Sequence, residues 1–289
     1  MKDKVSRLVQ RQIERLAGWR SLRQRRVLAR YFAGRMLTAT GLWRFVVLKR
    51  RDFVLRFYPS AMSISEWTAP GERQDEEDFF RNYLRPGDNV MDVGANVGTL
   101  TLVASRAVGP NGSVVALEPH PRIYGFLLGN LALNKVRNVV THNVAVGAAK
   151  GQVWLTSTTS DDQNSVTTQP GGVQVQVVPL DEVIATGDEI ALLKIDVEGY
   201  ERHVLAGATR TLRRTNCVYF ESSDQAFARF GYGVAEVTGL LRDAGFEIFR
   251  FGPTGTIESF GANDSSPRCE NLLAVRDAKS FGKRLGVQL

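Results

Sequence analysis

The feature that most constrains the fold is an alternation of short apolar runs, glycine-containing turns and helical segments from residue 90 onward. The expected strands cover residues 90–93, 113–117, 139–146, 191–195 and 218–220, and the expected helices cover 100–108, 124–133, 200–206 and 234–244. Such an alternation predicts an α/β fold with a doubly wound, mostly parallel sheet. A ligand is then expected at the carboxyl ends of the strands, near the point where the strand order reverses.

The length and the cysteine content exclude several other classes. A chain of 289 residues suffices for one large α/β domain with an appendage. Cys217 and Cys269 do not form a CxxC pair, which argues against a zinc ribbon and against a disulfide framework. No apolar run approaches the ~18 to 20 residues of a membrane span. We therefore expect a reducing, cytoplasmic location.

Positive charge is concentrated at the N-terminus. Residues 1–51 hold 15 Lys and Arg but two acids, a net charge of +13, whereas the remainder carries −6. We expect a basic arm over residues 1–69, formed by helices and then a β-hairpin, followed by the α/β domain over residues 70–289. The hairpin is predicted by two apolar runs on either side of a charged turn at residues 49–52.

An arm of this charge suits an anionic partner, either a membrane surface or nucleic acid. Leu8, Ile13, Leu16 and Trp19 could lie in a lipid interface while the arginines meet anionic headgroups. This pattern favours peripheral contact of residues 1–51 with the inner face of a membrane. The alternatives are an N-terminal subdomain that packs its apolar stripe on the body, a nucleic-acid contact, and an oligomer contact.

A glycine-rich turn, Asp92-Val93-Gly94-Ala95-Asn96-Val97-Gly98, directly follows the first expected strand. Glycines here let the backbone pass close to a ligand, whose anionic group meets the helix N-terminus. The middle glycine of the dinucleotide pattern is missing, and Asp92 precedes Gly94, which suits a ligand with an ammonium group as well as a carboxylate. Glu118 ends the next strand and could accept both hydroxyls of a ribose. A tight turn without a ligand is the alternative.

A second motif places carboxylates at the end of the fourth expected strand. Residues 192–201 read Leu-Leu-Lys-Ile-Asp-Val-Glu-Gly-Tyr-Glu, an apolar strand followed by two acids and a glycine. Asp196 and Glu198 would face the reactive end of the cofactor, where a carboxylate can deprotonate or orient a hydroxyl, or hold a divalent cation. The alternative for Asp196, Glu198 and Glu201 is helix capping or compensation of the helix dipole.

Neighbouring residues extend this second motif. Lys194 alternates to the other side of its strand and is expected to pair with an acid. Glu221 ends the fifth strand and could share the pocket. Asp196 and Glu221 end adjacent strands, but the sequence identifies no third ligand, so we predict no metal ion.

These motifs resemble those of FkbM-family methyltransferases. The resemblance rests on residues 92–98, Leu117-Glu118-Pro119, Leu180-Asp181-Glu182 and residues 193–201, followed by Val204-Leu205-Ala206-Gly207-Ala208, and it spans roughly residues 70–251. It implies a Rossmann-like class I methyltransferase fold with a seven-stranded sheet whose last strand is antiparallel. It also implies S-adenosyl-L-methionine as donor and a hydroxyl of a sugar, glycolipid or polyketide as acceptor. The basic arm is not part of the family pattern.

The resemblance also assigns residues to roles. The predicted cofactor-binding residues are Asp92, Gly94, Ala95, Asn96, Gly98, Glu118 and Pro119, and the predicted catalytic residues are Asp196 and Glu198. An RNA or other nucleic-acid methyltransferase is one alternative, for which the basic arm is the best argument. It is disfavoured because the fourth strand lacks the Asn/Asp-Pro-Pro-aromatic turn that stacks a planar base. A nucleotide-binding oxidoreductase of similar fold is the other alternative.

Overall fold

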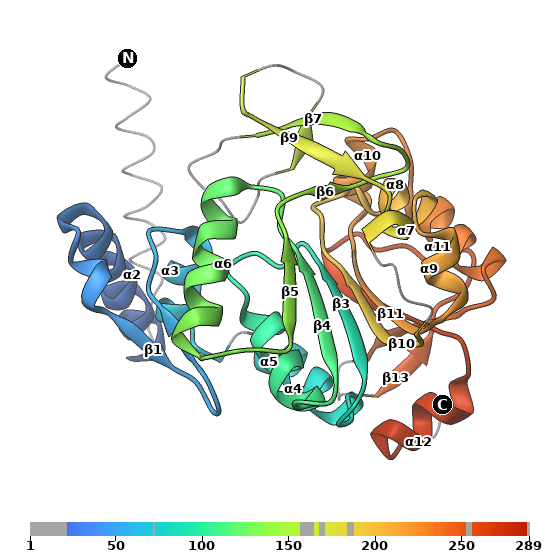
Figure 1. Ribbon diagram of the computed structural model, residues 1–289, viewed down its shortest axis with the longest axis horizontal. Coiled ribbons are helices and arrows are strands. Elements are labelled where there is room, and N and C mark those ends of the chain that lie inside the picture. The colour runs from blue at the N-terminus through green and yellow to red at the C-terminus, as the bar shows by residue number, and fades with distance from the viewer. Residues whose placement is uncertain are drawn as a thin grey trace.

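The computed structural model describes residues 22–71, 73–156, 165–167, 171–183, 188–252 and 256–287. In this part of the chain an eight-stranded sheet forms the centre of the molecule (Figure 1). Its strands, in spatial order, are β13 (Ile257–Ser259), β12 (Glu247–Phe251), β14 (Glu270–Val275), β11 (Thr215–Ser222), β10 (Ile190–Ile195), β3 (Asn89–Val93), β4 (Ser113–Leu117) and β5 (Val139–His142). The five from β11 to β5 are parallel. The predicted doubly wound, mostly parallel sheet is confirmed.

The sheet has one strand more than predicted. The seven strands from β5 to β12 match the expected number, and β14, the last in sequence, runs antiparallel between β11 and β12. The additional strand is β13, which pairs with β12 in antiparallel register at the sheet edge. Its three residues, Ile-Glu-Ser, are too few to show a strand periodicity in the sequence.

Helices cover both faces of the sheet. One face packs against α4 (Gln74–Tyr83), α5 (Thr99–Val108), α6 (Pro121–Leu133) and α12 (Ala278–Leu285). The other packs against α7 (Leu180–Val183), α8 (Glu201–Ala206), α9 (Thr209–Arg213), α10 (Asp224–Ala228) and α11 (Val234–Asp243). Side chains alternate along a strand, so Cys217 and Tyr219 of β11 join the first core while Val218 and Phe220 join the second.

A second, four-stranded sheet lies over the carboxyl ends of the main strands (Figure 1). Its order is β6 (Ala145–Val146), β9 (Val173–Val178), β7 (Gly151–Leu155) and β8 (Val166–Thr167). The β-rich residues 153–155 fall in β7, and residues 173–178 form β9. Much of the polar stretch 157–172 lies outside the described residues.

The third expected strand, residues 139–146, is wrong as a single element. The chain leaves the main sheet after β5 and enters the second sheet as β6. Asn143 lies at the break, where its side-chain amide donates hydrogen bonds to the carbonyl oxygens of Glu118 (2.8 Å) and Pro119 (2.9 Å). This bridge holds the chain against the end of β4 instead of letting it continue along the sheet.

The N-terminal unit contains the predicted helix and hairpin. α2 (Leu22–Thr40) is a helix of the predicted basic arm. Leu8, Ile13, Leu16 and Trp19, which were expected in a lipid interface, lie outside the described residues. The turn η1 (Leu42–Phe45) then leads into the antiparallel hairpin of β1 (Val47–Lys49) and β2 (Val54–Arg56), which is followed by α3 (Ala61–Thr68). The boundary between residues 69 and 70 stays a prediction. Leu55 and Phe57 share one core with Phe80 of α4.

Two asparagines, one in α6 and one directly after it, bind the backbone of β2 along its outer edge, where no further strand pairs with it. Asn134 accepts from the Val54 amide and donates to the Val54 carbonyl, at 2.9 and 2.7 Å. Asn130 is fully buried; it accepts from the Arg56 amide at 2.9 Å and donates to the Val97 carbonyl at 2.8 Å. Asn130 thus joins the hairpin to the glycine-rich turn.

Replacement of Asn130 by alanine should lower the free energy of unfolding by about 2–4 kcal/mol, because it leaves the partly buried amide of Arg56 and the buried carbonyl of Val97 without partners at about 1–3 kcal/mol each. Urea denaturation followed by circular dichroism measures the change. Asn82→Ala on the exposed side of α4 is the control and should change stability by less than about 0.5 kcal/mol. Equal stability of the two variants would contradict the bridge.

Candidate active site

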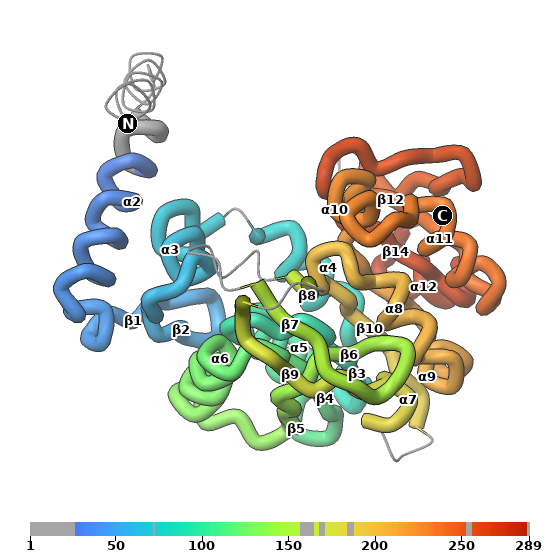
Figure 2. The backbone as a smooth tube through the Cα atoms, turned by 90° about the horizontal axis from the view of Figure 1, so that it is seen from above, coloured from blue at the N-terminus to red at the C-terminus, as the bar shows by residue number. Residues whose placement is uncertain are grey.

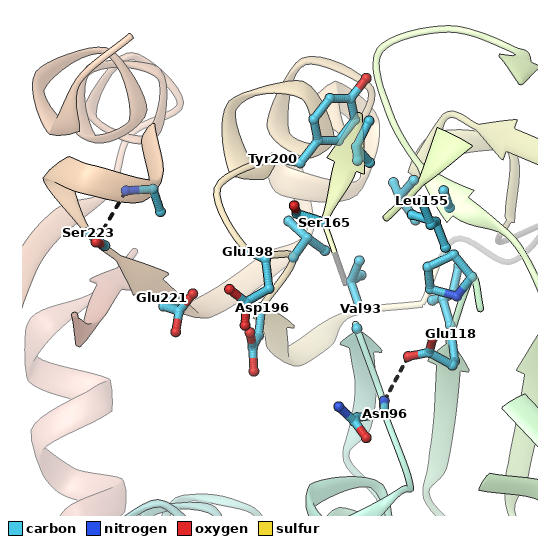
Figure 3. Close-up of a pocket in the computed structure, with 18 of the residues that line it drawn as sticks. Val93, Asn96, Glu118, Leu155, Ser165, Asp196, Glu198, Tyr200, Glu221 and Ser223 are labelled. Atoms are coloured by element: carbon cyan, nitrogen blue, oxygen red, sulfur yellow. Dashed lines mark hydrogen bonds between the residues drawn. The ribbon is translucent and has the colours of Figure 1, made fainter. Parts of the chain in front are cut away.

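A cavity of about 850 Å³ opens at the carboxyl ends of β3, β4, β10 and β11, where a doubly wound sheet binds its ligand. Figure 3 shows Glu118 and Asn96 on one side of it and Asp196, Glu198 and Glu221 on the other. Of the predicted site residues, those that line it are Gly94, Asn96, Glu118, Pro119, Asp196 and Glu198. Its volume is that of pockets that enclose organic ligands of ordinary size.

The glycine-rich turn is shaped by backbone contacts. The amides of Gly94 and Ala95 both donate to the Leu117 carbonyl at 2.9 Å, which ties the turn to the end of β4. Gly94 has φ 81°, and a Cβ there would lie 1.8 Å from the carbonyl oxygen of Asp196. Glycine is therefore required, both for the left-handed backbone and for the close approach of the two strand ends.

The first acid of this motif lies beneath the turn. Asp92 is 1% exposed, and its carboxylate oxygens lie 3.0 Å from Lys194 Nζ and 2.5 Å from the Thr101 hydroxyl, which donates to it. Lys194 Nζ also donates to the Gly94 carbonyl at 2.6 Å. Lys194 pairs with an acid, as expected. Asp92 supports the turn from below and, like Ala95 and Gly98, does not line the large cavity.

Glu118 directly follows β4 and binds the glycine-rich turn and the residue before α6. Its carboxylate accepts from the Asn96 amide at 3.0 Å and from the His120 amide at 2.9 Å. Burial raises the pKa of Glu118 to about 7, and the two amide donors lower it in part. The carboxylate lines the cavity beside apolar Leu117, Val146 and Leu155. This end of the cavity suits a ligand with hydroxyl groups attached to a flat apolar ring.

Three carboxylates converge at the other end. Asp196, Glu198 and Glu221 each offer an oxygen, and these oxygens lie within 4.8 Å of one another. Burial, and then the charge of Asp196, raise the pKa of Glu221 to about 7. Cys269 Sγ donates to Glu221 at 2.9 Å. A cluster of three carboxylates can accept a proton near neutral pH or hold a divalent cation.

Glu198 has an unusual backbone. Its φ is 56°, in the left-handed region that residues other than glycine, asparagine and aspartate rarely adopt. Arg229 Nη2 donates to the Glu198 carbonyl at 2.9 Å and helps to hold this conformation. Backbone strain of this kind costs about 1–3 kcal/mol and gathers at functional sites.

Glu201 has the structural role that the sequence offered as an alternative. It is fully buried at the start of α8 and accepts from the Val197 amide at 3.1 Å. Burial raises its pKa to about 8. Glu201 does not line the large cavity.

Other cavity residues were not identified as site residues from the sequence. Arg73 donates two hydrogen bonds to Glu76, at 3.0 and 2.7 Å, and Asn271 donates to the same carboxylate at 3.2 Å. Glu76 belongs to the acidic first turn of α4, where acids are also favoured by the helix dipole. Arg229 follows α10. No local motif marks these residues, because they come from three distant segments.

Comparison with known proteins identifies relatives. The family model described as "Methyltransferase FkbM domain" matches residues 92–248. The chain is 26% identical over 192 residues to "Hexuronic acid methyltransferase AglP" of Haloferax volcanii, covering 64% of this chain and 75% of that protein. It is 32% identical over 200 residues to "31-O-demethyl-FK506 methyltransferase FkbM" of Streptomyces tacrolimicus, covering 57% and 75%. A crystal structure of Methyltransferase FkbM from Methylobacillus flagellatus gives a TM-score of 0.42 at 16% identity, covering 73% and 54%.

The buried ion pair under the turn leads to a stability prediction. Lys194→Met should lower the free energy of unfolding by about 3–5 kcal/mol, because it leaves the buried carboxylate of Asp92 without its partner. Adding Asp92→Asn to that variant should restore part of the loss. Urea denaturation of the three proteins measures both effects.

The control for this prediction is an exposed ion pair. Lys150 lies 2.6 Å from Glu182 at the surface, so Lys150→Met should change stability by less than about 1 kcal/mol. A small effect of Lys194→Met, matching that of Lys150→Met, would show that the buried pair does not support the turn.

Proposed function

This chain belongs to the FkbM methyltransferase family, and we propose that it transfers a methyl group from S-adenosylmethionine to a hydroxyl oxygen of a sugar-type or polyketide-type acceptor. The observation that carries the proposal is a single cavity with Glu118 and the glycine-rich turn at one end and three carboxylates at the other. Membership of a methyltransferase family excludes the oxidoreductase alternative.

Glu118 and the glycine-rich turn form the donor end. The Glu118 carboxylate accepts two backbone hydrogen bonds and keeps lone pairs free for the hydroxyls of a ribose. Apolar side chains beside it, from Leu117, Val146 and Leu155, suit an adenine ring. S-adenosylmethionine supplies an electrophilic methyl group when it is bound. Gly94 and Asn96 line the passage toward the carboxylates and would orient that group.

Asp196, Glu198 and Glu221 form the acceptor end. An alcohol must lose a proton as its oxygen is methylated, and a carboxylate within hydrogen-bond reach can take it. We assign the proton to Asp196, with Glu198 and Glu221 holding the hydroxyl in position. The cavity would hold acceptor and donor next to each other, so that alignment contributes to the rate.

Two relatives support an oxygen acceptor. One is named as a methyltransferase of hexuronic acid, and the other as a methyltransferase of a demethylated oxygen on FK506. Both names describe small molecules or sugars with hydroxyl groups. A cluster of three carboxylates would also repel the phosphates of a nucleic acid. RNA methylation is therefore disfavoured as the alternative.

The acceptor class is tested with radioactive methyl donor. The purified protein is incubated with tritiated S-adenosylmethionine and either a total glycan and lipid extract or bulk RNA. We expect label in the glycan and lipid extract, and mass spectrometry then identifies the methylated hydroxyl. Label in RNA alone would contradict the proposal.

The donor site predicts tight binding of S-adenosylhomocysteine and none of NAD, both measured by calorimetry. Glu118→Gln should weaken that binding by roughly 10- to 100-fold, because hydrogen bonds to a charged group contribute about 1.5–3 kcal/mol. Glu182→Gln, in an exposed ion pair, is the control and should bind like the wild type. Binding of NAD without S-adenosylhomocysteine would overturn the donor assignment.

A substitution at the acceptor end should slow turnover without weakening the binding of S-adenosylhomocysteine. Asp196→Asn should lower turnover by about 10²- to 10⁴-fold, the usual contribution of a general base, and change S-adenosylhomocysteine affinity only a few-fold. Asp243→Asn on the exposed side of α11 is the matched control. Turnover is followed as label transferred to the glycan and lipid extract. If Asp196→Asn loses cofactor binding while it stays folded, Asp196 belongs to the donor site instead.

Chelation separates proton transfer from metal chemistry at the same carboxylates. The sequence analysis predicted no metal because it found no third ligand, and the structure brings Glu198 beside Asp196 and Glu221. If Asp196 acts as the base without a metal ion, methyl transfer continues when EDTA is added. Loss of activity in EDTA and its return with Mg²⁺ would assign the three carboxylates to a cation.

A further inference from the structure

Large apolar side chains are exposed in one short part of the N-terminal unit. Of the eleven such side chains exposed in the described part of the chain, six fall between residues 31 and 47. They are Tyr31, Phe32, Met36, Leu42, Phe45 and Val47, here called the N-terminal apolar surface. Phe45 is 83% exposed, Met36 63% and Phe32 56%. Exposed apolar groups gathered in this way mark an interaction site more often than single ones do.

α2 turns an apolar stripe away from the protein. Its inner face packs on α3, where Gly34 lies against the Trp67 ring and Trp67 Nε1 donates to the Arg30 carbonyl at 2.9 Å. Its outer face carries Ala29, Phe32, Ala33 and Met36, all exposed and spaced three to four residues apart. Because α2 already has its packing partner in α3, the outer stripe is not required for folding.

The same segment is basic without compensating acids. Residues 27–51 contain six Lys and Arg and no Asp or Glu. Arg50 pairs with Glu66. The other five are Arg30, Arg35, Arg44, Lys49 and Arg51; all are exposed, and none forms an ion pair among the described residues. The segment that carries the N-terminal apolar surface therefore also carries five exposed cations without an acidic partner among the described residues.

We infer that the N-terminal apolar surface docks on an anionic lipid membrane, with Phe32, Met36 and Phe45 in the interface and the neighbouring cations on the headgroups. A basic helix with an apolar face binds a membrane in this way, parallel to its plane. No helix in the described part of the chain is long and apolar enough to cross a membrane. The contact is therefore one of docking on the surface.

Two other occupants fit the surface less well. Single-stranded nucleic acid could stack its bases on the aromatic rings of this surface, but it would leave the exposed side chains of Met36, Leu42 and Val47 in water. A second copy of the chain in a symmetric dimer would place the same five cations opposite each other. A lipid surface satisfies both the apolar groups and the charges.

The position of α3 connects this surface to the active site. α3 packs on α2, and Met62 of α3 lines the large cavity. Figure 2 shows α2 at one end of the molecule with α3 between it and the strand ends that hold the cavity. A chain docked through α2 would hold its cavity close to the membrane, within reach of a lipid-linked acceptor.

The test is sedimentation of the full-length protein with vesicles, one set of phosphatidylcholine and one of phosphatidylcholine with phosphatidylglycerol. At low salt we expect the protein to sediment with the anionic vesicles and to stay in solution with the neutral ones. Raising the salt should release it, because headgroup attraction is screened over about 8 Å at physiological ionic strength. Vesicle binding needs no acceptor or donor, so it can fail while the proposed activity stands.

Matched variants assign the binding to this surface. Phe32→Ser with Met36→Ser, and separately Arg35→Glu with Arg44→Glu, should each reduce the bound fraction at least about tenfold. The controls are exposed residues elsewhere, Val140→Ser with Leu240→Ser and Arg213→Glu with Arg268→Glu, which should bind like the wild type. All changed side chains are exposed, so circular dichroism should show unchanged folding.

Three outcomes would overturn the inference. The first is equal sedimentation with neutral and anionic vesicles, and the second is wild-type binding by both variants of the N-terminal apolar surface. The third is that the protein does not sediment with anionic vesicles but retains structured RNA in a filter assay. That result would make the surface a nucleic-acid contact.

Discussion

The active site depends on the buried ion pair between Lys194 and Asp92. Asp92 lies in β3 and Lys194 opposite it in β10, so the pair joins the two central strands of the sheet. The same ammonium group donates to the Gly94 carbonyl and lies 3.5 Å from Asp196. One buried cation therefore contacts both the glycine-rich turn and the first acid of the acceptor end. Because a buried charge is costly without its partners, this geometry admits few alternatives.

Close backbone contact between Gly94 and Asp196 also holds the two turns together. The carbonyl of Asp196 occupies the space that a side chain at position 94 would need, so the two turns meet only because that residue is Gly94. Two residues after Asp196, Glu198 adopts a left-handed conformation and turns the chain into α8. The donor and acceptor ends of the cavity are thus formed by two adjoining turns, and a shift of either one would change both.

Asn130 connects the N-terminal unit to this arrangement. Asn130 reaches from α6 to the β2 backbone on one side and to the Val97 carbonyl of the glycine-rich turn on the other. The hairpin and the turn therefore share a buried partner. On our inference the outer face of α2 meets a membrane, and the contacts of α3 and Asn130 would then set the orientation of the donor end relative to the lipid.

Local patterns in the sequence determined the alternation of strands and helices, the basic arm with its hairpin, and the two motifs around Gly94 and Asp196, since periodicity and turn residues act within a few positions. Other features depended on contacts between distant segments. The burial of Asp92, the splitting of residues 139–146 between two sheets and the hydrogen bonds of Glu76 with Arg73 and Asn271 at the cavity follow from strand order and register. The sequence leaves these open, because the same local pattern is compatible with several pairings; only the tertiary structure decided them.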